Sequence, residues 1–267
     1  MILRHMREPM DGQPAENTFE AVDERSGAQL GACTIYVHKN AELFPNRPIR
    51  IYMDISGDPA PDALLGAAVA RAKELGQLSG EPCRIFTQVE PEDHDRLSTL
   101  VLFGFKDSDG LVCMERSLPC TGEGILPPGS VVVRDDLDDP LEQQYFLERY
   151  NQLYNETFDE EWLAQFRAAE GFQRLLIVSP AGMQSEAVIW QENGAGVIGW
   201  LYTARKWRGK GLARCLTELA CDEFEARGFV FARAEVQAKI PNVLHLMERC
   251  GFRQKELLLR YPGIDMN

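Results

Sequence analysis

One stretch of the sequence organises the rest of the chain; it reads Leu201-Tyr202-Thr203-Ala204-Arg205-Lys206-Trp207-Arg208-Gly209-Lys210-Gly211-Leu212-Ala213. Residues 197–201 before the turn are largely apolar, as in a strand. After the turn, apolar residues recur at helical spacing until Gly228. We therefore expect the chain to pass from a strand through a basic turn into the N-terminus of a helix.

This turn has the composition of an anion site. Gly209 and Gly211 lack Cβ atoms, so backbone N–H groups can approach a ligand closely, and the positive end of a helix favours phosphate. Four cations stand within the turn: Arg205, Lys206, Arg208 and Lys210. The alternative is a solvated basic turn without a ligand. A nucleoside triphosphatase loop is excluded because the chain has no GxxxxGK[ST] sequence.

Composition limits the classes of function. A hydrophobic content of 45% with 26% charged residues is ordinary for a globular protein, and 267 residues favour two domains. No run approaches the about 20 apolar residues of a membrane span, and the N-terminus lacks an apolar signal segment. We therefore expect a cytoplasmic protein without a membrane partner. The net charge of −13 argues against nucleic-acid binding.

The seven cysteines are scattered and form neither a CxxC pair nor a zinc-ligand spacing. We expect packed, reduced thiols and no metal site. Cys215 and Cys221 lie in the helix after the turn, where small apolar filling is the favoured role. A catalytic thiol is the alternative, although no partner histidine is identifiable.

The C-terminal half predicts a regular series of elements. A strand is expected at 131–134, a helix capped by Asp139 with Pro140 at its first position, and a second helix after Asp159. Strands follow at 175–178, 187–190 and 197–201. After the helix that begins at the turn, we expect a strand at 230–237 and a helix ending at Gly251-Phe252.

The two halves repeat each other at one spacing. Gly251 lies 147 residues beyond Gly104, Leu212 lies 148 beyond Leu64, and Glu235 lies 147 beyond Gln88. This predicts two tandem domains, 1–120 and 121–267, joined at the Gly- and Pro-rich segment 119–129. Within the first domain we expect a hairpin around Asp109-Gly110.

The basic turn resembles motif A of the GNAT acetyltransferase superfamily, Gln/Arg-x-x-Gly-x-Gly/Ala, with Arg208, Gly211 and Ala213 at its fixed positions. The Gly-Phe endings resemble the family's closing motif. The resemblance covers the C-terminal half and, with degraded motifs, the N-terminal half. It implies a mixed α/β (α+β) fold of two tandem GNAT-like domains, each with a mostly antiparallel twisted sheet flanked by helices.

The resemblance also implies acetyl-CoA as cosubstrate. Its pyrophosphate is expected on the N–H groups from Gly209 to Arg214, and its pantetheine beside the strand that precedes the turn. Asn242 stands two residues after Ile240, where the family often carries asparagine, and is kept as a candidate contact. The expected cofactor-binding residues are Leu201, Tyr202, Thr203, Arg208, Gly209, Lys210, Gly211, Leu212, Ala213, Arg214 and Asn242.

The corresponding N-terminal turn differs in its chemistry. Ala60-Pro61-Asp62-Ala63 stands in register with Arg208-Gly209-Lys210-Gly211, without its glycines or cations. Asp58 and Asp62 would repel a pyrophosphate. The N-terminal copy is therefore expected to have lost cofactor binding and to serve as a packing partner or as a wall of the acceptor site.

An acetyl transfer to an amine needs a polarising donor, a base and a proton source. The main-chain N–H of Leu201 is the candidate donor. Glu235 is the candidate catalytic base, since burial on an otherwise apolar strand would raise its pKa; the alternative is an outward-facing strand residue. Met247 stands where the family usually has a tyrosine that acts as the general acid. The substitutes for this acid are Tyr202, His245, Cys250 or water.

The leading hypothesis is an acetyltransferase acting on an amine of a small molecule or peptide, as a monomer or homodimer. Its rival is a non-catalytic acyl-CoA-binding module with a vestigial active site. A structural or interaction protein that binds no coenzyme A is the third class. Acidic residues on the helices of the acceptor side favour a cationic amine, unless they form only a solvated face: Glu142, Glu148, Asp159, Glu160 and Glu161.

Overall fold

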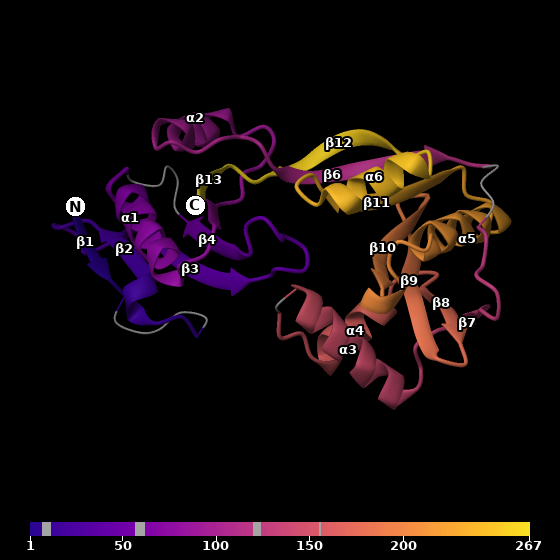
Figure 1. Ribbon diagram of the computed structural model, residues 1–267. Helices are drawn as coiled ribbons and strands as arrows, with labels where there is room; N and C mark the ends of the chain where they lie inside the picture. Colours follow the sequence, from indigo (N-terminus) through magenta and orange to yellow (C-terminus); the bar gives the residue numbers. More distant parts are fainter. Residues whose placement is uncertain (7–11, 57–61, 120–123, 155) are drawn as a thin grey trace. The chain divides into compact units, whose positions relative to one another are not determined.

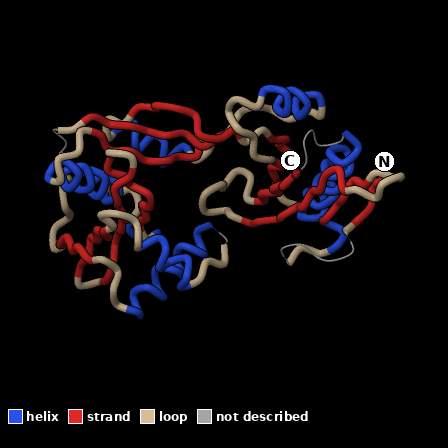
Figure 2. The backbone as a smooth tube through the Cα atoms, turned by 180° about the vertical axis from the view of Figure 1, so that it is seen from behind, coloured by secondary structure: helices blue, strands red, loops and turns tan. Residues whose placement is uncertain are grey.

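The computed structural model describes residues 1–6, 12–56, 62–119, 124–154 and 156–267. They divide into two compact units (Figure 1). Unit 1 comprises Met1–Leu111 with Leu258–Asn267, and unit 2 comprises Val112–Leu257. Each unit contains one mixed but mostly antiparallel sheet with helices packed on it, as Figure 2 shows, which confirms the predicted α/β fold class. None of the described helices is long and apolar enough to span a bilayer.

Unit 1 is built on a six-stranded sheet. In spatial order its strands are β1 (Ile2–His5), β2 (Thr18–Val22), β3 (Gln29–Lys39), β4 (Ile49–Ser56), β5 (Cys83–Phe86) and β13 (Gly263–Met266). Among these described strands, only β4 and β5 run parallel to each other. Helix α1 (Asp62–Ser79) connects these two strands and buries Leu64, Leu65 and Ala68 in the core. The shorter elements are η1 (Ala15–Asn17) and α2 (His94–Leu102).

Unit 2 is built on a seven-stranded sheet. In spatial order its strands are β12 (Arg253–Arg260), β6 (Gly110–Ser117), β11 (Phe231–Gln237), β10 (Ala195–Thr203), β9 (Gly182–Glu192), β8 (Gln173–Ser179) and β7 (Val131–Asp135). Strand β10 runs parallel to β11 and is connected to it by α5 (Leu212–Ala226). Helices α5 and α6 (Pro241–Arg249) contribute to the hydrophobic core on one face.

Aromatic residues cover the opposite face of the unit 2 sheet. They come from α3 (Pro140–Tyr154) and α4 (Glu160–Arg167). Phe146 contacts Trp200 at a centroid distance of 5.7 Å, and Phe166 contacts Trp190 at 5.3 Å. The predicted caps of both helices are confirmed: Asp139 accepts from the N–H of Leu141, and Asp159 from that of Trp162. The sheet that carries the basic turn therefore has helices on both faces.

The predicted hairpin around Asp109-Gly110 is wrong, because the strand that begins at Gly110 belongs to the sheet of unit 2. Strand β6 starts at Gly110 but lies between β11 and β12 of unit 2, and β13, which the sequence did not predict, pairs with β5 of unit 1. The compact units consequently differ from the expected domains 1–120 and 121–267. Cys120 lies outside the described residues.

Buried charges in unit 1 explain why Asp109 does not lie in an exposed hairpin. Its carboxylate is fully buried, and Oδ2 lies 3.5 Å from Nη2 of Arg50. Arg84, also buried, donates to Oδ1 of Asp265 on β13 at 2.7 Å and to the carbonyl of Tyr261 at 3.0 Å. A buried guanidinium requires such partners, so Arg84 fixes the C-terminal segment in this sheet.

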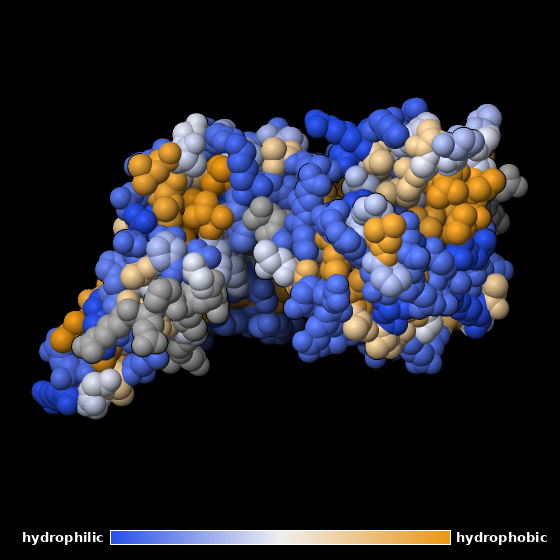
Figure 3. Space-filling view, turned by 90° about the horizontal axis from the view of Figure 1, so that it is seen from below, coloured by the Kyte–Doolittle hydropathy of each residue, from blue (hydrophilic) through white to orange (hydrophobic). Residues whose placement is uncertain are grey.

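The surface is mainly hydrophilic on the face drawn in Figure 3, with separate hydrophobic patches between the charged side chains. This agrees with a net charge of −13. Isolated exposed apolar residues such as Leu78 and Leu102 are normal on a protein surface. The two core clusters, one in each unit, hold most of the buried large apolar side chains.

Candidate functional site

The parallel pairing of β10 with β11 stops halfway along the two strands. It comprises the pairs Gly196 with Ala232 through Ile198 with Ala234. Strand β10 nevertheless continues beside β9 as far as Thr203, opposite Ser185. A bulge at Gly199, where the register with β9 shifts, separates the two parts of β10. Beyond Ile198, β10 is therefore paired with β9 and, among the described strands, with none on its other side.

This end of β10 directs main-chain donors toward the unpaired side. The N–H of Ala204 donates to the carbonyl of Gln184 on the β9 side at 3.0 Å. Because backbone groups alternate along a strand, the N–H groups of Leu201 and Thr203 point the other way. The side chain of Thr203 is held by a 2.8 Å contact between its hydroxyl and that of Ser185. The strand thus supplies fixed donors before the basic turn begins.

The basic turn presents the N-terminus of α5 to open space. After η2 (Arg205–Trp207), Gly209 and Gly211 adopt φ values of 74° and 81°, and a Cβ built on either would meet nothing within 4 Å. Gly211 caps α5 without a side-chain hydrogen bond, and its carbonyl accepts from Cys215. The N–H groups at the first three helical positions, 212–214, therefore have no intrahelical acceptor. An anion would satisfy them.

Cations stand in the same turn and at the start of α5. Arg208 folds back and donates from Nε to the carbonyl of Thr203 at 3.0 Å, which closes the turn. Arg214 is exposed at the third position of α5. Nζ of Lys210 lies 4.3 Å from the ring centroid of Trp207. The structure therefore combines helix N–H groups and positive charge at one turn, as the sequence predicted.

The family comparison agrees with this geometry. The model of the acetyltransferase (GNAT) family matches residues 135–252, which include the split strand, the turn and α5. This part of the chain belongs to the GNAT family. No curated protein matches the chain.

Solved structures share the GNAT fold over nearly the whole chain. A GCN5-related N-acetyltransferase from Sphaerobacter thermophilus has a TM-score of 0.54 at 16% identity and covers 96% of this chain and 82% of its own. A probable N-acyltransferase of unknown function from Enterococcus faecalis V583 has a TM-score of 0.55 at 11% identity and covers 92% of this chain and 61% of its own. At such identities the likeness shows the fold alone.

Glu235 lies on β11, one residue beyond the last parallel pair. Val197 pairs with both Arg233 on β11 and Trp190 on β9, so Glu235 shares their sheet face, opposite α5. Its side chain is exposed, but the loss of hydration beside the surrounding protein raises the pKa of Glu235, and the negative charge of Glu192 adds to this rise. The exposure keeps the predicted base accessible, and its environment differs from that of a free carboxylate.

The candidate proton donors of the GNAT domain have different surroundings. Met247, at the position of the family's tyrosine, is 2% exposed and belongs to the core. Burial raises the pKa of the equally buried Cys250 to about 11. His245 is exposed on α6, and the half-buried Tyr202 stacks on Trp200 at a centroid distance of 6.0 Å. Among these side chains, Tyr202 is on the strand that leads into the turn.

Two further predicted sites lie at the starts of helices. Asn242 is exposed in the first turn of α6, two residues from the N-cap Ile240. At the N-terminal counterpart of the turn, Asp62 and Ala63 are exposed at the start of α1. Asp58, Ala60 and Pro61 lie outside the described residues. Asp62 thus places a carboxylate where α5 has a glycine-lined, cationic entry.

The acidic residues predicted on the acceptor side have mixed roles. Glu142 accepts from the buried Arg174 at 3.1 Å, and Asp159 caps α4, so both stabilise the fold. Glu148 and Glu160 line a cavity of about 440 Å³ beside α3. Glu161 is exposed in the first turn of α4.

Three residues near the site were not predicted. Gly199 forms the bulge in β10. Trp207 lies beside Lys206 and Lys210, and the charge of Glu192 raises the pKa of Glu235. A glycine within a strand pattern is a sequence signal for a bulge, so Gly199 could have been found. Trp207 lies next to Lys206 in the sequence, so its place beside the lysines is local, whereas Glu192 comes near Glu235 only through the fold and has no sequence signal.

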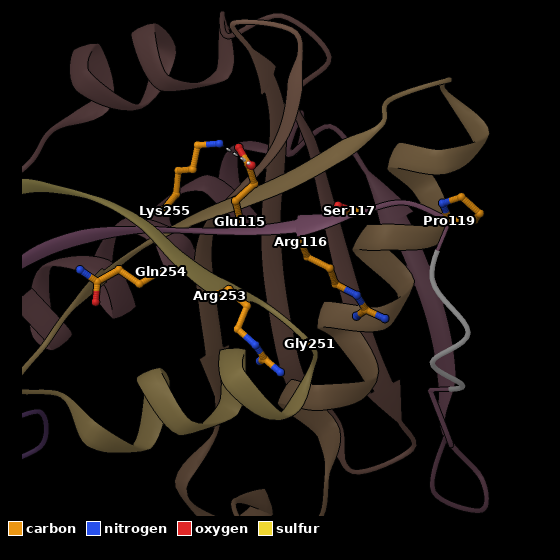
Figure 4. Close-up of a pocket in the computed structure, with 8 residues that line it drawn as sticks. All are labelled: Glu115, Arg116, Ser117, Pro119, Gly251, Arg253, Gln254 and Lys255. Atoms are coloured by element: carbon orange, nitrogen blue, oxygen red, sulfur yellow. Dashed lines mark hydrogen bonds and ion pairs between the residues drawn. The ribbon is translucent and has the colours of Figure 1, made fainter.

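A separate cavity of about 520 Å³ lies between β6 and the start of β12 and contains none of the predicted site residues. Figure 4 shows Lys255 directed to Glu115, at 3.2 Å, whereas Arg116 and Arg253 point elsewhere. Arg116 donates to the buried Glu218 at 2.8 Å, and Arg253 to main-chain carbonyls. The three cations that line this cavity are hydrogen-bonded to protein groups and do not converge on a ligand position.

Proposed function

We propose that the GNAT domain transfers an acetyl group from acetyl-CoA to an amine of a small molecule or peptide. The observation that carries the proposal is the open, glycine-lined N-terminus of α5 directly after the part of β10 that has lost its pairing with β11. The first feature suits a diphosphate, and the second suits an extended chain with amide groups that can pair with a strand.

The residues present fit coenzyme A. A Cβ would not be obstructed at Gly209 or Gly211, so, chain neighbours apart, no atom of the described residues lies within 4 Å of a Cβ at these two positions. In the proposal, the N–H groups of 209–214 hold the pyrophosphate, Arg208 and Arg214 neutralise it, and Leu201 to Thr203 line the pantetheine. Asn242 remains a proposed contact. When bound, acetyl-CoA supplies an activated acetyl group.

The chain's own residues would then arrange the proton and the charge. The N–H of Leu201 points to the unpaired side of β10 and would donate to the oxygen that becomes negative during transfer. Glu235, ionised, would accept the proton that the amine nitrogen loses as its bond to the acyl carbon forms. The leaving thiolate needs a proton from Tyr202, His245 or water, since Cys250 is buried and Met247 has no proton to give.

A second candidate function is a non-catalytic acyl-CoA-binding module. The observation that favours it is Met247, which fills the position of the family's acid with a buried thioether. Unit 1, with Asp62 at the corresponding turn, is proposed to bind no cofactor in either case. A cytoplasmic location, a monomeric or homodimeric state and a cationic acceptor belong to the same proposal.

Turnover separates the two candidates. The full chain is incubated with acetyl-CoA and a panel of polyamines, amino sugars, arylalkylamines and lysine peptides, and free thiol is measured against the uncatalysed background. Release above background that depends on one amine class supports the transferase. Binding of coenzyme A by calorimetry without turnover on any amine supports the module, and no binding contradicts both.

A further inference from the structure

Trp207 forms a support for two lysines beside the α5 N-terminus. Nζ of Lys210 lies 4.3 Å and Nζ of Lys206 lies 5.7 Å from the centroid of the indole ring. The negative face of an indole attracts ammonium groups at such distances. Both lysines are exposed, whereas Trp207 is half-buried and packs against the core of unit 2. The two charges are therefore held near the turn before any ligand arrives.

The indole ring is fixed by packing. Its Nε1 is buried and has no hydrogen-bond partner among the described residues. An unpaired buried N–H costs free energy. A ring that could turn freely would therefore turn to expose this donor to water. The ring stays inward, so the contacts with the core outweigh that cost. A fixed ring gives Lys206 and Lys210 a common, stable support.

The number of cations exceeds what a pyrophosphate needs. A pyrophosphate diester carries about two charges, for which the N–H groups of 212–214 with Arg208 and Arg214 suffice. Arg205, Lys206 and Lys210 remain, in a chain whose net charge is −13, and the two lysines lie against Trp207. A phosphate monoester carries almost two negative charges at neutral pH and attracts paired ammonium groups more strongly than a diester does. Coenzyme A carries such a group on its ribose.

This inference rests on the proposed function: we propose that Lys206 and Lys210, supported by Trp207, form a subsite for the ribose 3′-phosphate of coenzyme A. The subsite makes the turn select coenzyme A over 3′-dephospho-coenzyme A. Trp207 is a positioning residue that acts through the two lysines. The backbone of the turn is left to bind the pyrophosphate that both ligands share.

Calorimetry with the full chain and both ligands tests the subsite. We expect the wild type to bind coenzyme A about tenfold more tightly than the dephospho form, a difference of about 1.4 kcal/mol. Lys206→Gln with Lys210→Gln should abolish this preference while retaining affinity for the dephospho form. Lys73→Gln with Lys106→Gln, two exposed positions in unit 1, removes the same charge and should keep the preference.

The role of Trp207 has its own readout. Trp207→Phe keeps a ring with a weaker negative face and should retain part of the preference, whereas Trp207→Leu should lose it without weakening dephospho-coenzyme A binding. Equal affinity of the wild type for both ligands, or an equal loss for both ligands in the lysine variant, would overturn the subsite. If the wild type binds neither ligand, the proposed function itself fails.

Discussion

Gly199 leaves no room for a side chain beside Trp190: a Cβ built on Gly199 would lie 1.7 Å from Cη2 of the indole. The bulge in the β10–β9 pairing, directly after the last β10–β11 pair, is thus covered by a ring that leaves space only for glycine.

Gly199→Ala should destabilise unit 2. The methyl group forces either Trp190 or β10 to move, and such overpacking costs about 1 to 3 kcal/mol. Urea unfolding followed by circular dichroism, which reports both units, measures the loss. Gly66→Ala is the matched control, because its Cβ would meet Phe103 at an ordinary 3.7 Å within α1. The control should be neutral or stabilising. Equal stability of Gly199→Ala and the wild type would contradict the contact.

Gly211→Asp should weaken coenzyme A binding by about tenfold to a hundredfold, because one negative charge within about 4 Å of a phosphate costs roughly 1 to 4 kcal/mol. Gly211→Asn is the matched control: it has the same size and asparagine tolerates positive φ values. Calorimetry on both variants isolates the charge. Indistinguishable affinities of the Asp and Asn variants would show that the phosphate does not bind at this turn.

Ala63→Asp should leave coenzyme A affinity unchanged. Ala63 stands in the first turn of α1, where Asp62 already places an exposed carboxylate. The same titration gives the stoichiometry, which we expect to be one ligand per chain. Two ligands per chain at saturation, or a loss of one of them in Ala63→Asp, would assign a working site to unit 1.

Glu235→Gln should lower kcat by about a hundredfold or more and leave coenzyme A affinity near the wild-type value. A base acts only when ionised. The pKa of Glu235 is raised above 4.5, so the wild-type rate should fall as the pH drops through a value above 4.5. This acid limb should be absent from the residual rate of the variant. Full kcat with an unchanged acid limb would leave water as the proton acceptor.

Glu192→Gln provides a finer test of the same group. Its negative charge adds to the rise in the pKa of Glu235, so its removal should move the acid limb to lower pH while kcat at neutral pH is retained. The pH profile of kcat/KM measures the shift. A limb that stays in place would mean that Glu235 does not carry it.

Asp265→Asn should destabilise unit 1 by about 1 to 2 kcal/mol, because the buried Arg84 loses a charged acceptor. Asp107→Asn is the control, since Asp107 pairs with the more exposed Arg260. Hydrogen exchange at β5 reports unit 1 directly. Protection of β5 equal to that of the wild type would show that this ion pair does not hold β13.

Local sequence signals determined the elements and the turn. The helix caps at Asp139 and Asp159, the glycines that need positive φ before α5, and the Gly-Phe helix endings at 104 and 251 were all readable because each depends on a few consecutive residues. Recognition of the GNAT domain followed from the same kind of signal, since its turn is contiguous in sequence.

Only the tertiary structure decided which strands pair and which side chains meet. The alternating pattern of β6 predicts a strand but does not name its neighbours, and its place between β11 and β12 depends on contacts with residues more than a hundred positions away. The same holds for Arg84 with Asp265 and for Glu192 with Glu235. Burial and charge pairing act across the folded chain, so sequence spacing carries no record of them.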